Sequence, residues 1–116
     1  MTPATATIAL RTVSSPNMRE HWAVRARRVK AERNAARFSL PGQLGGRFAM
    51  PCTVTLTRVT PPRGKTLDDD NLRGCLKAVR DGVADWLGVA DNDPRVTWRY
   101  DQRKGEAWQV VVEVTA

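Results

Sequence analysis

Apolar and polar residues alternate along four short stretches of the chain, and this pattern predicts four strands. In residues 4–13, alanine, isoleucine and leucine alternate with threonine and arginine. The same period of two recurs in residues 51–60, 96–100 and 108–114. Since successive side chains of a strand point to opposite faces of a sheet, each stretch predicts a strand with one buried face. The polar turn at residues 101–105 predicts that the last two strands pair as a hairpin.

Spacings of three and four residues predict a helix in the middle of the chain. From residue 71 to residue 88 the apolar side chains fall on one face, which is typical of a helix that buries that face. The stripe consists of Leu72, Cys75, Leu76, Val79, Val83, Trp86 and Leu87. Such a helix is about 27 Å long. It is expected to end at Gly88, because glycine readily adopts the left-handed conformation of a helix C-terminus.

A second, more basic helix is predicted from Met18 to about Phe38. Asn17 precedes this helix, and Glu20 follows Asn17 by three residues, which is the spacing of a capping box. After it, residues 39–50 are rich in glycine and proline and show no period, so they predict a loop.

These elements predict the order β-α-β-α-β-β, with no internal repeat. A chain of 116 residues is long enough for one modest core, so we expect a single domain over residues 1–116. The expected fold class is α+β: a small mixed β-sheet with two helices packed on one face.

Charge is unevenly distributed along the chain. The net charge is +7, and residues 1–67 hold twelve Lys/Arg and two acids, whereas seven of the twelve acids fall between Asp68 and Asp93. A basic protein with its acids in one place suits a polyanionic partner and a local metal site. On the basic helix, Arg25 and Arg28 are candidate phosphate contacts. The alternative is a solvated helix surface on a basic domain without a nucleic-acid role, and charge alone leaves both open.

Composition disfavours several kinds of site. Cys52 and Cys75 are far apart and lie at apolar positions, so they predict neither a disulfide framework nor a cysteine zinc site. His21 is the single histidine and has no acid placed to orient it, which argues against a histidine-based triad. The sequence has no apolar run of transmembrane length and no signal core, so we expect no membrane partner and a cytoplasmic location.

Two acidic clusters bracket the central helix. Asp68 and Asp70 precede it at a spacing that points both carboxylates to one side of an extended segment. Asp91 and Asp93 follow it at the same spacing. Four converging carboxylates suit one or two Mg²⁺ ions, with Mn²⁺ as an alternative, and such ions activate water for attack on a phosphate. The cationic side chains that are candidates to bind the phosphate are Arg63, Lys65, Arg73 and Lys77.

Each cluster also has a purely structural interpretation. An aspartate such as Asp70 is a common helix N-cap, because it accepts hydrogen bonds from free backbone N–H groups. Asp93 followed by Pro94 is an ordinary turn signal. A cap explains one aspartate, however, and not three adjacent ones that repel each other.

Together these segments resemble a known nuclease family. The sequences DDDNL at residues 68–72, KAVRD at 77–81 and DNDPRV at 91–96 are similar to the RusA family of Holliday-junction resolvases. The family pattern is Asp-x-Asp-Asn-Leu, a lysine with an aspartate four residues later, and an acidic pair just past the helix. The resemblance implies a small homodimeric, Mg²⁺-dependent endodeoxyribonuclease that makes paired nicks across four-way junctions. In it, Asp68 and Asp70 match the first acidic motif.

This sequence departs from the family pattern at two places. The family lysine usually lies three residues after the asparagine, where this chain has Gly74, and Lys77 follows three residues later. Either the start of the helix is lengthened, or Lys77 or Arg73 takes the role of this lysine. The family acidic pair is usually adjacent, whereas one residue separates Asp91 from Asp93 here, and both stay candidates.

The expected function is that of a structure-selective endodeoxyribonuclease in DNA recombination and repair, with branched DNA as its partner. The expected catalytic residues are Asp68, Asp70, Asp91, Asp93 and Lys77. The alternative is a non-catalytic basic DNA-binding protein whose acids cap a helix and keep the surface soluble. A third interpretation is a nuclease that acts on RNA or flaps.

Overall fold

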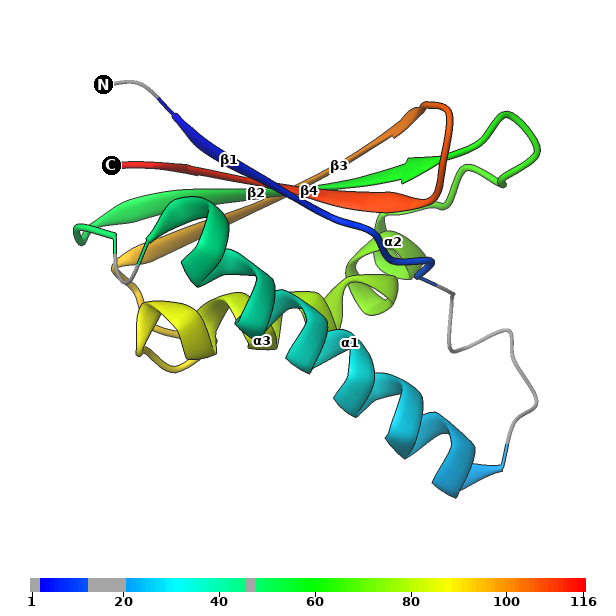
Figure 1. Cartoon of the computed structure of the whole chain (residues 1–116), viewed down its shortest axis with the longest axis horizontal. Helices are drawn as coiled ribbons and strands as arrows, with labels where there is room; N and C mark the ends of the chain where they lie inside the picture. The colour runs from blue at the N-terminus through cyan, green and yellow to red at the C-terminus, as the bar shows by residue number, and fades with distance from the viewer. Residues whose placement is uncertain (1–2, 13–20, 46–47) are drawn as a thin grey trace.

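The computed structural model describes residues 3–12, 21–45 and 48–116. Along this part of the chain the elements are β1 (Ala4–Ile8), α1 (Trp22–Leu44), β2 (Cys52–Thr60), α2 (Asp69–Cys75), α3 (Lys77–Leu87), β3 (Val96–Lys104) and β4 (Gln109–Thr115). The described strands form one mixed sheet in the order β1-β4-β2-β3, and α1 and α3 lie on the same face of it (Figure 1). The predicted combination of a small mixed sheet with helices is therefore confirmed, whereas the order of elements differs because an additional helix is present.

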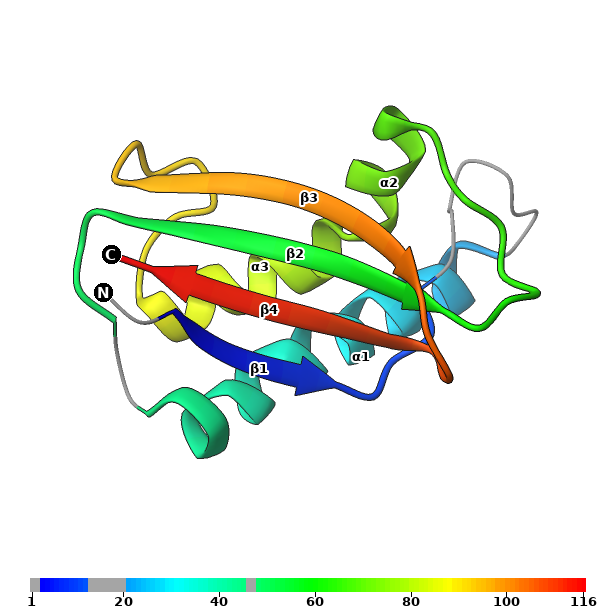
Figure 2. The same cartoon turned by 90° about the horizontal axis from the view of Figure 1, so that it is seen from above.

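The predicted hairpin between the last two strands is wrong. β3 pairs with β2 in parallel, and β4 lies between β1 and β2, antiparallel to both (Figure 2). The side chains of Val110, Val112 and Val114 are fully buried, which suits a central strand. β3 instead exposes charged side chains along one face, as edge strands often do. The order of the strands depends on which strands become buried in the folded protein. The alternation of apolar and polar residues along the chain does not indicate that order.

A short connection carries the chain from β3 across the end of β2 to β4 (Figure 2). Gly105, its first residue, donates its N–H to the carbonyl oxygen of Thr60 at 2.8 Å. A Cβ atom at this position would lie 2.6 Å from Cγ1 of Val59, which is closer than side chains approach. Glycine is therefore needed where the chain passes over β2. Residues 101–104, which the sequence predicts as part of a turn, belong to β3.

Helix α1 ends at Leu44, so the predicted loop is wrong for residues 39–44. Leu40 in this segment is fully buried. The side-chain amide of Gln43 accepts a hydrogen bond from the N–H of Thr7 at 2.9 Å and donates one to its carbonyl at 3.0 Å. These tertiary contacts keep the last turn helical although it contains Pro41.

The predicted start of this helix at Met18, with its capping box, lies outside the described residues. The described helix begins at Trp22, and Nδ1 of His21 accepts the N–H of Ala23 at 3.2 Å as its N-cap. None of the helices in the described part of the chain is long and apolar enough to span a membrane.

The predicted central helix consists of two helices, α2 and α3, that meet at Leu76. Leu76 has φ −98° and ψ 2°, which interrupts the regular helix. Hydrogen bonds from Leu76 N–H to Leu72 O and from Arg80 N–H to Leu76 O continue on either side, so the chain changes direction without forming a loop (Figure 2). As predicted, α3 ends at Gly88 in the left-handed conformation, with φ 74°.

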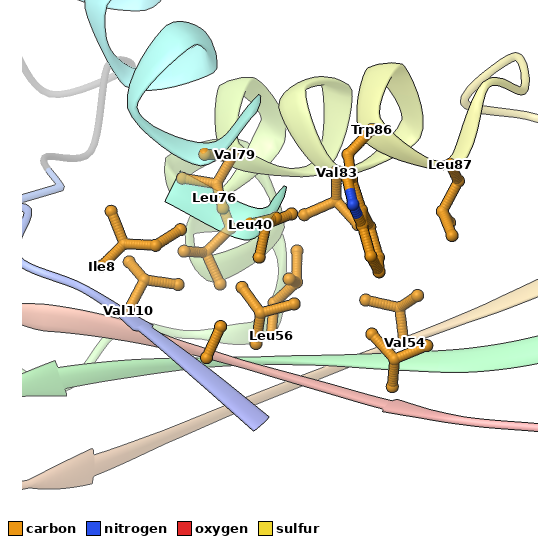
Figure 3. Packing of buried hydrophobic residues seen from close by; sticks show 14 of the residues in the cluster. Ile8, Leu40, Val54, Leu56, Leu76, Val79, Val83, Trp86, Leu87 and Val110 are labelled. Atoms are coloured by element: carbon orange, nitrogen blue, oxygen red, sulfur yellow. The ribbon is translucent and has the colours of Figure 1, made fainter. Parts of the chain in front are cut away.

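The core lies between the sheet and the helices. Val54, Leu56 and Val110 from the sheet face a helical layer (Figure 3). That layer contains Leu40, Leu76, Val79, Val83, Trp86 and Leu87. Burying each of these side chains stabilises the fold by about 1.5–3 kcal/mol. This burial fixes one side of α2 and α3 against the sheet and so determines which polar side chains face outward. Cys52 and Cys75 are also buried as free thiols, at the apolar positions that the sequence predicts.

Helices α1 and α3 cross at very close range at Gly82. A Cβ atom there would lie 2.3 Å from the carbonyl oxygen of Arg33 and 2.7 Å from Cβ of Ala36. Arg33 also donates two hydrogen bonds to the carboxylate of Asp85 across the same crossing, at 2.7 and 2.8 Å. These hydrogen bonds hold the pKa of Asp85 below its ordinary value.

The variant Gly82→Ala is expected to destabilise the fold by about 1–3 kcal/mol, because the added methyl group overlaps the backbone of α1. Thermal unfolding followed by circular dichroism measures the change. Gly74→Ala is the matched control, since a Cβ atom at position 74 meets no atom within 4 Å. Alanine there is expected to raise stability by up to about 1 kcal/mol through helix propensity. Equal unfolding temperatures for the two variants would contradict the close crossing.

Candidate functional site

The first acidic cluster forms the N-terminus of α2. Asp68 is the N-cap: its carboxylate accepts the backbone N–H of Asn71 at 2.8 Å and the side-chain amide of the same residue at 3.0 Å. The cap role that the sequence suggested for Asp70 therefore belongs to Asp68. Asp69 and Asp70 are exposed in the first turn, where negative charge interacts favourably with the helix dipole.

The chain folds back after Gly88 and brings Asp91 to the first turns of α3. Nζ of Lys77 lies 2.7 Å from a carboxylate oxygen of Asp91 and 2.7 Å from one of Asp81. Arg80 also donates to the carbonyl oxygen of Asp91, at 2.5 Å. The segments at residues 77–81 and 91–96, which resemble the RusA family in sequence, thus meet at the ammonium group of Lys77, fourteen residues before Asp91.

These ion pairs shift the titration of both partners. The hydrogen bond from Lys77 lowers the pKa of Asp91. Desolvation lowers the pKa of Lys77, but its hydrogen bonds to Asp81 and Asp91 outweigh that effect and leave the pKa above its ordinary value. Lys77 is therefore a firmly charged ammonium group at neutral pH.

Asp93 has a different role from Asp91. Its carboxylate accepts three hydrogen bonds from Arg95: one from the backbone N–H at 2.9 Å, and two from the guanidinium at 3.1 and 2.8 Å. These bonds lower the pKa of Asp93 to about 2. They close the turn that leads into β3, so the structural interpretation of the Asp93–Pro94 pair describes the observed contacts.

The carboxylates have the oxygen chemistry that Mg²⁺ prefers, but their arrangement does not make a metal centre. Among the residues described, no group of three or more His, Cys, Asp or Glu side chains is placed to hold a metal ion. Asp91 and Asp93 are paired with Lys77 and Arg95. In this arrangement the described acids do not converge on one point, and no hydrolytic step is assigned to a metal ion. A bound metal would require these carboxylates to move closer together.

A groove runs between the two helices and the edge strand β3. It has a volume of about 390 Å³ and is lined by Arg73, Gly74, Lys77, Arg80, Trp98 and Tyr100. We call these six residues the edge groove. A neighbouring pocket of about 380 Å³ shares three of them and adds Asp69, Leu72 and Arg99, so the groove continues toward the start of α2. β3 lies at the edge of the sheet beside α2 in Figure 2.

Cations and aromatic rings alternate in the edge groove. The guanidinium carbon of Arg80 lies 4.7 Å from the ring centroid of Trp98, and that of Arg73 lies 5.7 Å from the ring of Tyr100. Arg80 also donates to the hydroxyl of Tyr100 at 2.8 Å. Sequence reasoning missed Arg80, Trp98 and Tyr100. The available signal was the spacing of four and three between Arg73, Lys77 and Arg80, together with two aromatic residues on one face of a strand.

The structure separates the other predicted DNA contacts into two groups. Arg25 and Arg28 line a pocket of about 290 Å³ with Gly74 and Lys77, so they adjoin the edge groove. Arg28 lies 3.2 Å from the buried carboxylate of Glu32. The second group, in the loop between β2 and α2, contains Arg63 and Lys65, and Lys65 lines a different pocket with Gln102 and Lys104.

Removing Lys77 is expected to move the pKa of Asp91 up toward its ordinary value of 3.8, because the hydrogen bond from Lys77 is the main cause of the depression. Lys77→Met is therefore expected to raise the pH at which Asp91 titrates and to leave Asp93 near 2. Carboxyl ¹³C NMR titration measures both. Arg95→Met is the reciprocal control, which raises the pKa of Asp93 alone. An unchanged pKa of Asp91 in Lys77→Met would contradict this contact.

Comparison with known proteins adds one relative. No known protein-family model matches the sequence. The chain is 32% identical over 104 residues to an uncharacterized protein of Xylella fastidiosa (strain Temecula1), and the alignment covers 87% of this chain and 68% of that protein. Identity of this level over most of both chains indicates common descent. This chain belongs to the same family as that uncharacterized Xylella fastidiosa protein.

Proposed function

We propose that this protein is a structure-selective endodeoxyribonuclease that acts on four-way DNA junctions. The observation that carries the proposal is the contact between Lys77 and Asp91, which joins two segments that resemble the RusA family. Both residues lie beside a groove lined by cations and aromatic rings, which suits a nucleic acid strand. In this proposal Arg73 and Lys77 hold the backbone phosphate, because arginine and lysine are the usual phosphate contacts in proteins.

Mg²⁺, or Mn²⁺ in its place, is proposed as the cofactor on the resemblance and on the oxygen donors of the acidic clusters. Asp69, which lies between the candidate ligands Asp68 and Asp70 in the sequence, lines the pocket that continues the edge groove. A homodimer is proposed on the resemblance as well. Paired nicks across a four-way junction require two sites related by a two-fold axis, which a homodimer supplies.

A second candidate function is that of a non-catalytic basic DNA-binding protein. The ion pair of Asp93 with Arg95 and the helix cap formed by Asp68 favour it, because each of these acids already has a structural role. A single assay distinguishes the two candidate functions. A synthetic four-way junction incubated with the protein and Mg²⁺ is nicked symmetrically by an endonuclease, and EDTA stops the reaction; a binding protein shifts the junction in a gel and leaves it intact.

Asp70→Asn is expected to lower the nicking rate by about a hundredfold or more while junction affinity stays equal or rises slightly. The variant removes one negative charge and one strong metal ligand, and the helix cap on Asp68 is untouched. Glu106→Gln is the matched control, because it removes the same charge from an exposed position outside the groove. We expect it to change nicking by less than about threefold. Equal rates for folded Asp70→Asn and wild type would remove Asp70 from the site.

Junction affinity is expected to fall steeply with salt, because each phosphate contact releases counterions. Each contact contributes about −0.9 to the slope of log K against log salt. Arg73→Gln is expected to reduce the slope by about 1, and Arg37→Gln, an equal charge change outside the edge groove, to leave it unchanged. Fluorescence anisotropy over a salt series measures these slopes. A flat plot for wild type, or equal slopes for all three proteins, would count against phosphate binding in the groove.

A further inference from the structure

We infer that the edge groove holds one unstacked base of a DNA strand between Tyr100 and Arg73, with the adjoining phosphate near Lys77. This inference rests on the proposed function, because that function identifies DNA as the polymer to which the base belongs. The groove volume of about 390 Å³ falls in the range of small-ligand pockets. Bases freed from stacking bind proteins on aromatic side chains and on arginine planes, and both surfaces are present here.

The arginines that cover Trp98 and Tyr100 differ in how freely they can move. Arg80 is fixed beside Trp98, because it donates to the Tyr100 hydroxyl and to the carbonyl of Asp91. Arg73 is exposed, and its guanidinium lies over the Tyr100 ring. Of the two pairs, the one between Arg73 and Tyr100 is therefore the one that opens with less disturbance.

A base fits between Arg73 and Tyr100 after a small side-chain movement. The guanidinium carbon is 5.7 Å from the ring centroid, and a planar group in contact with both needs about 7 Å, which is twice a contact distance of about 3.5 Å. Rotation of one exposed arginine side chain supplies that difference. The base then lies between a ring and a cation, with its phosphate near Lys77.

Two residues that line the groove carry unsatisfied hydrogen-bond donors. Nε of Arg80 and Nε1 of Trp98 are buried and have no partner in the described part of the chain. An unpaired buried donor is costly for a fold, and such groups often mark a ligand site. Because both nitrogens are shielded from the surface, the acceptor atoms of a base reach them only when neighbouring side chains move.

Gly74 leaves the groove open on the helix side. A Cβ atom at this position meets nothing within 4 Å, although Gly74 lies on a helix between Arg73 and Cys75. Because Gly74 lines the edge groove, we expect a large side chain at this position to occupy part of the groove. The position therefore offers a way to fill the groove without removing a native contact.

The test compares binding of a short oligothymidylate with binding of the same strand lacking its bases, in EDTA so that no cleavage occurs. The wild-type protein is expected to bind the base-bearing strand about 5- to 100-fold more tightly. Tyr100→Leu is expected to bring this ratio close to one, and Tyr100→Phe, which keeps the ring, to preserve it. Anisotropy of a labelled strand gives both affinities.

Two further variants separate base binding from general effects on the fold. Gly74→Leu fills the groove and is expected to lower the ratio while the unfolding temperature is maintained, so the test holds if Tyr100→Leu does not fold. Phe38→Leu is the matched control: Phe38 carries Arg37 over its ring at 5.2 Å and lies outside the groove. It is expected to leave the ratio unchanged.

A wild-type ratio near one would overturn the inference. So would an unchanged ratio in folded Tyr100→Leu or in folded Gly74→Leu, or an equal loss in Phe38→Leu. Junction nicking in Mg²⁺, measured on the same proteins, tests the proposed function separately. A base-dependent ratio without nicking supports the groove and removes the nuclease; nicking without a base-dependent ratio does the reverse.

Discussion

Parallel pairing of β2 with β3 is the constraint on which the rest of the structure depends. Two neighbouring strands that run in the same direction need a connection that crosses back over the sheet, and α2 and α3 are that connection. The crossing buries Leu76 and Val83 against the sheet and directs the polar side of the helices outward. It also leaves β3 at the edge, where Trp98 and Tyr100 lie beside the helices. The edge groove is thus a consequence of the strand order.

The electrostatics of the site follow from the same crossing. Because α3 must reach back to the start of β3, the loop after Gly88 is short and returns along the helix, which places Asp91 beside Lys77 and Arg80. The cations on the outward side of α3 are therefore partly neutralised at one end of the groove. Arg73 is not involved in these ion pairs and lies over Tyr100 instead. Arg73 therefore contributes positive charge to the groove from α2, beside the acids at the start of that helix.

The local patterns of the sequence predicted most of the elements, and long-range contacts determined the rest. Alternation identified β1, β2 and β4, and the left-handed Gly88 marked the end of α3. The order of the strands was not predictable from alternation, because a period of two is equally compatible with a hairpin and with two separated strands. The turn of helix over residues 39–44 depends on the burial of Leu40 and on the contact of Gln43 with β1. Neither is visible in a window of sequence.

The candidate site shows the same division. Acidic spacing identified Asp68 and Asp91 as residues of interest, but which acid caps the helix and which meets a lysine depends on the fold. The aromatic half of the groove was missed because Trp98 and Tyr100 read as one face of a buried strand. They line a groove only because β3 is an edge strand next to an arginine-bearing helix.

In the proposed resemblance to the RusA family, the break at Leu76 bears directly on which residue takes the role of that family's lysine. Moving a residue three positions along a regular helix rotates it by about 300° and advances it by about 4.5 Å, so it returns to nearly the same face one turn further on. Lys77 is displaced from the family position by this amount, away from Asp68 and toward the carboxyl end of the crossing. The change of direction at Leu76 lies within this interval and orients Lys77 to Asp91. Arg73, which precedes the break, stays on α2 with the first acidic cluster. In the proposed function, contact with the acids therefore belongs to Lys77, and Arg73 joins Lys77 in contact with the phosphate.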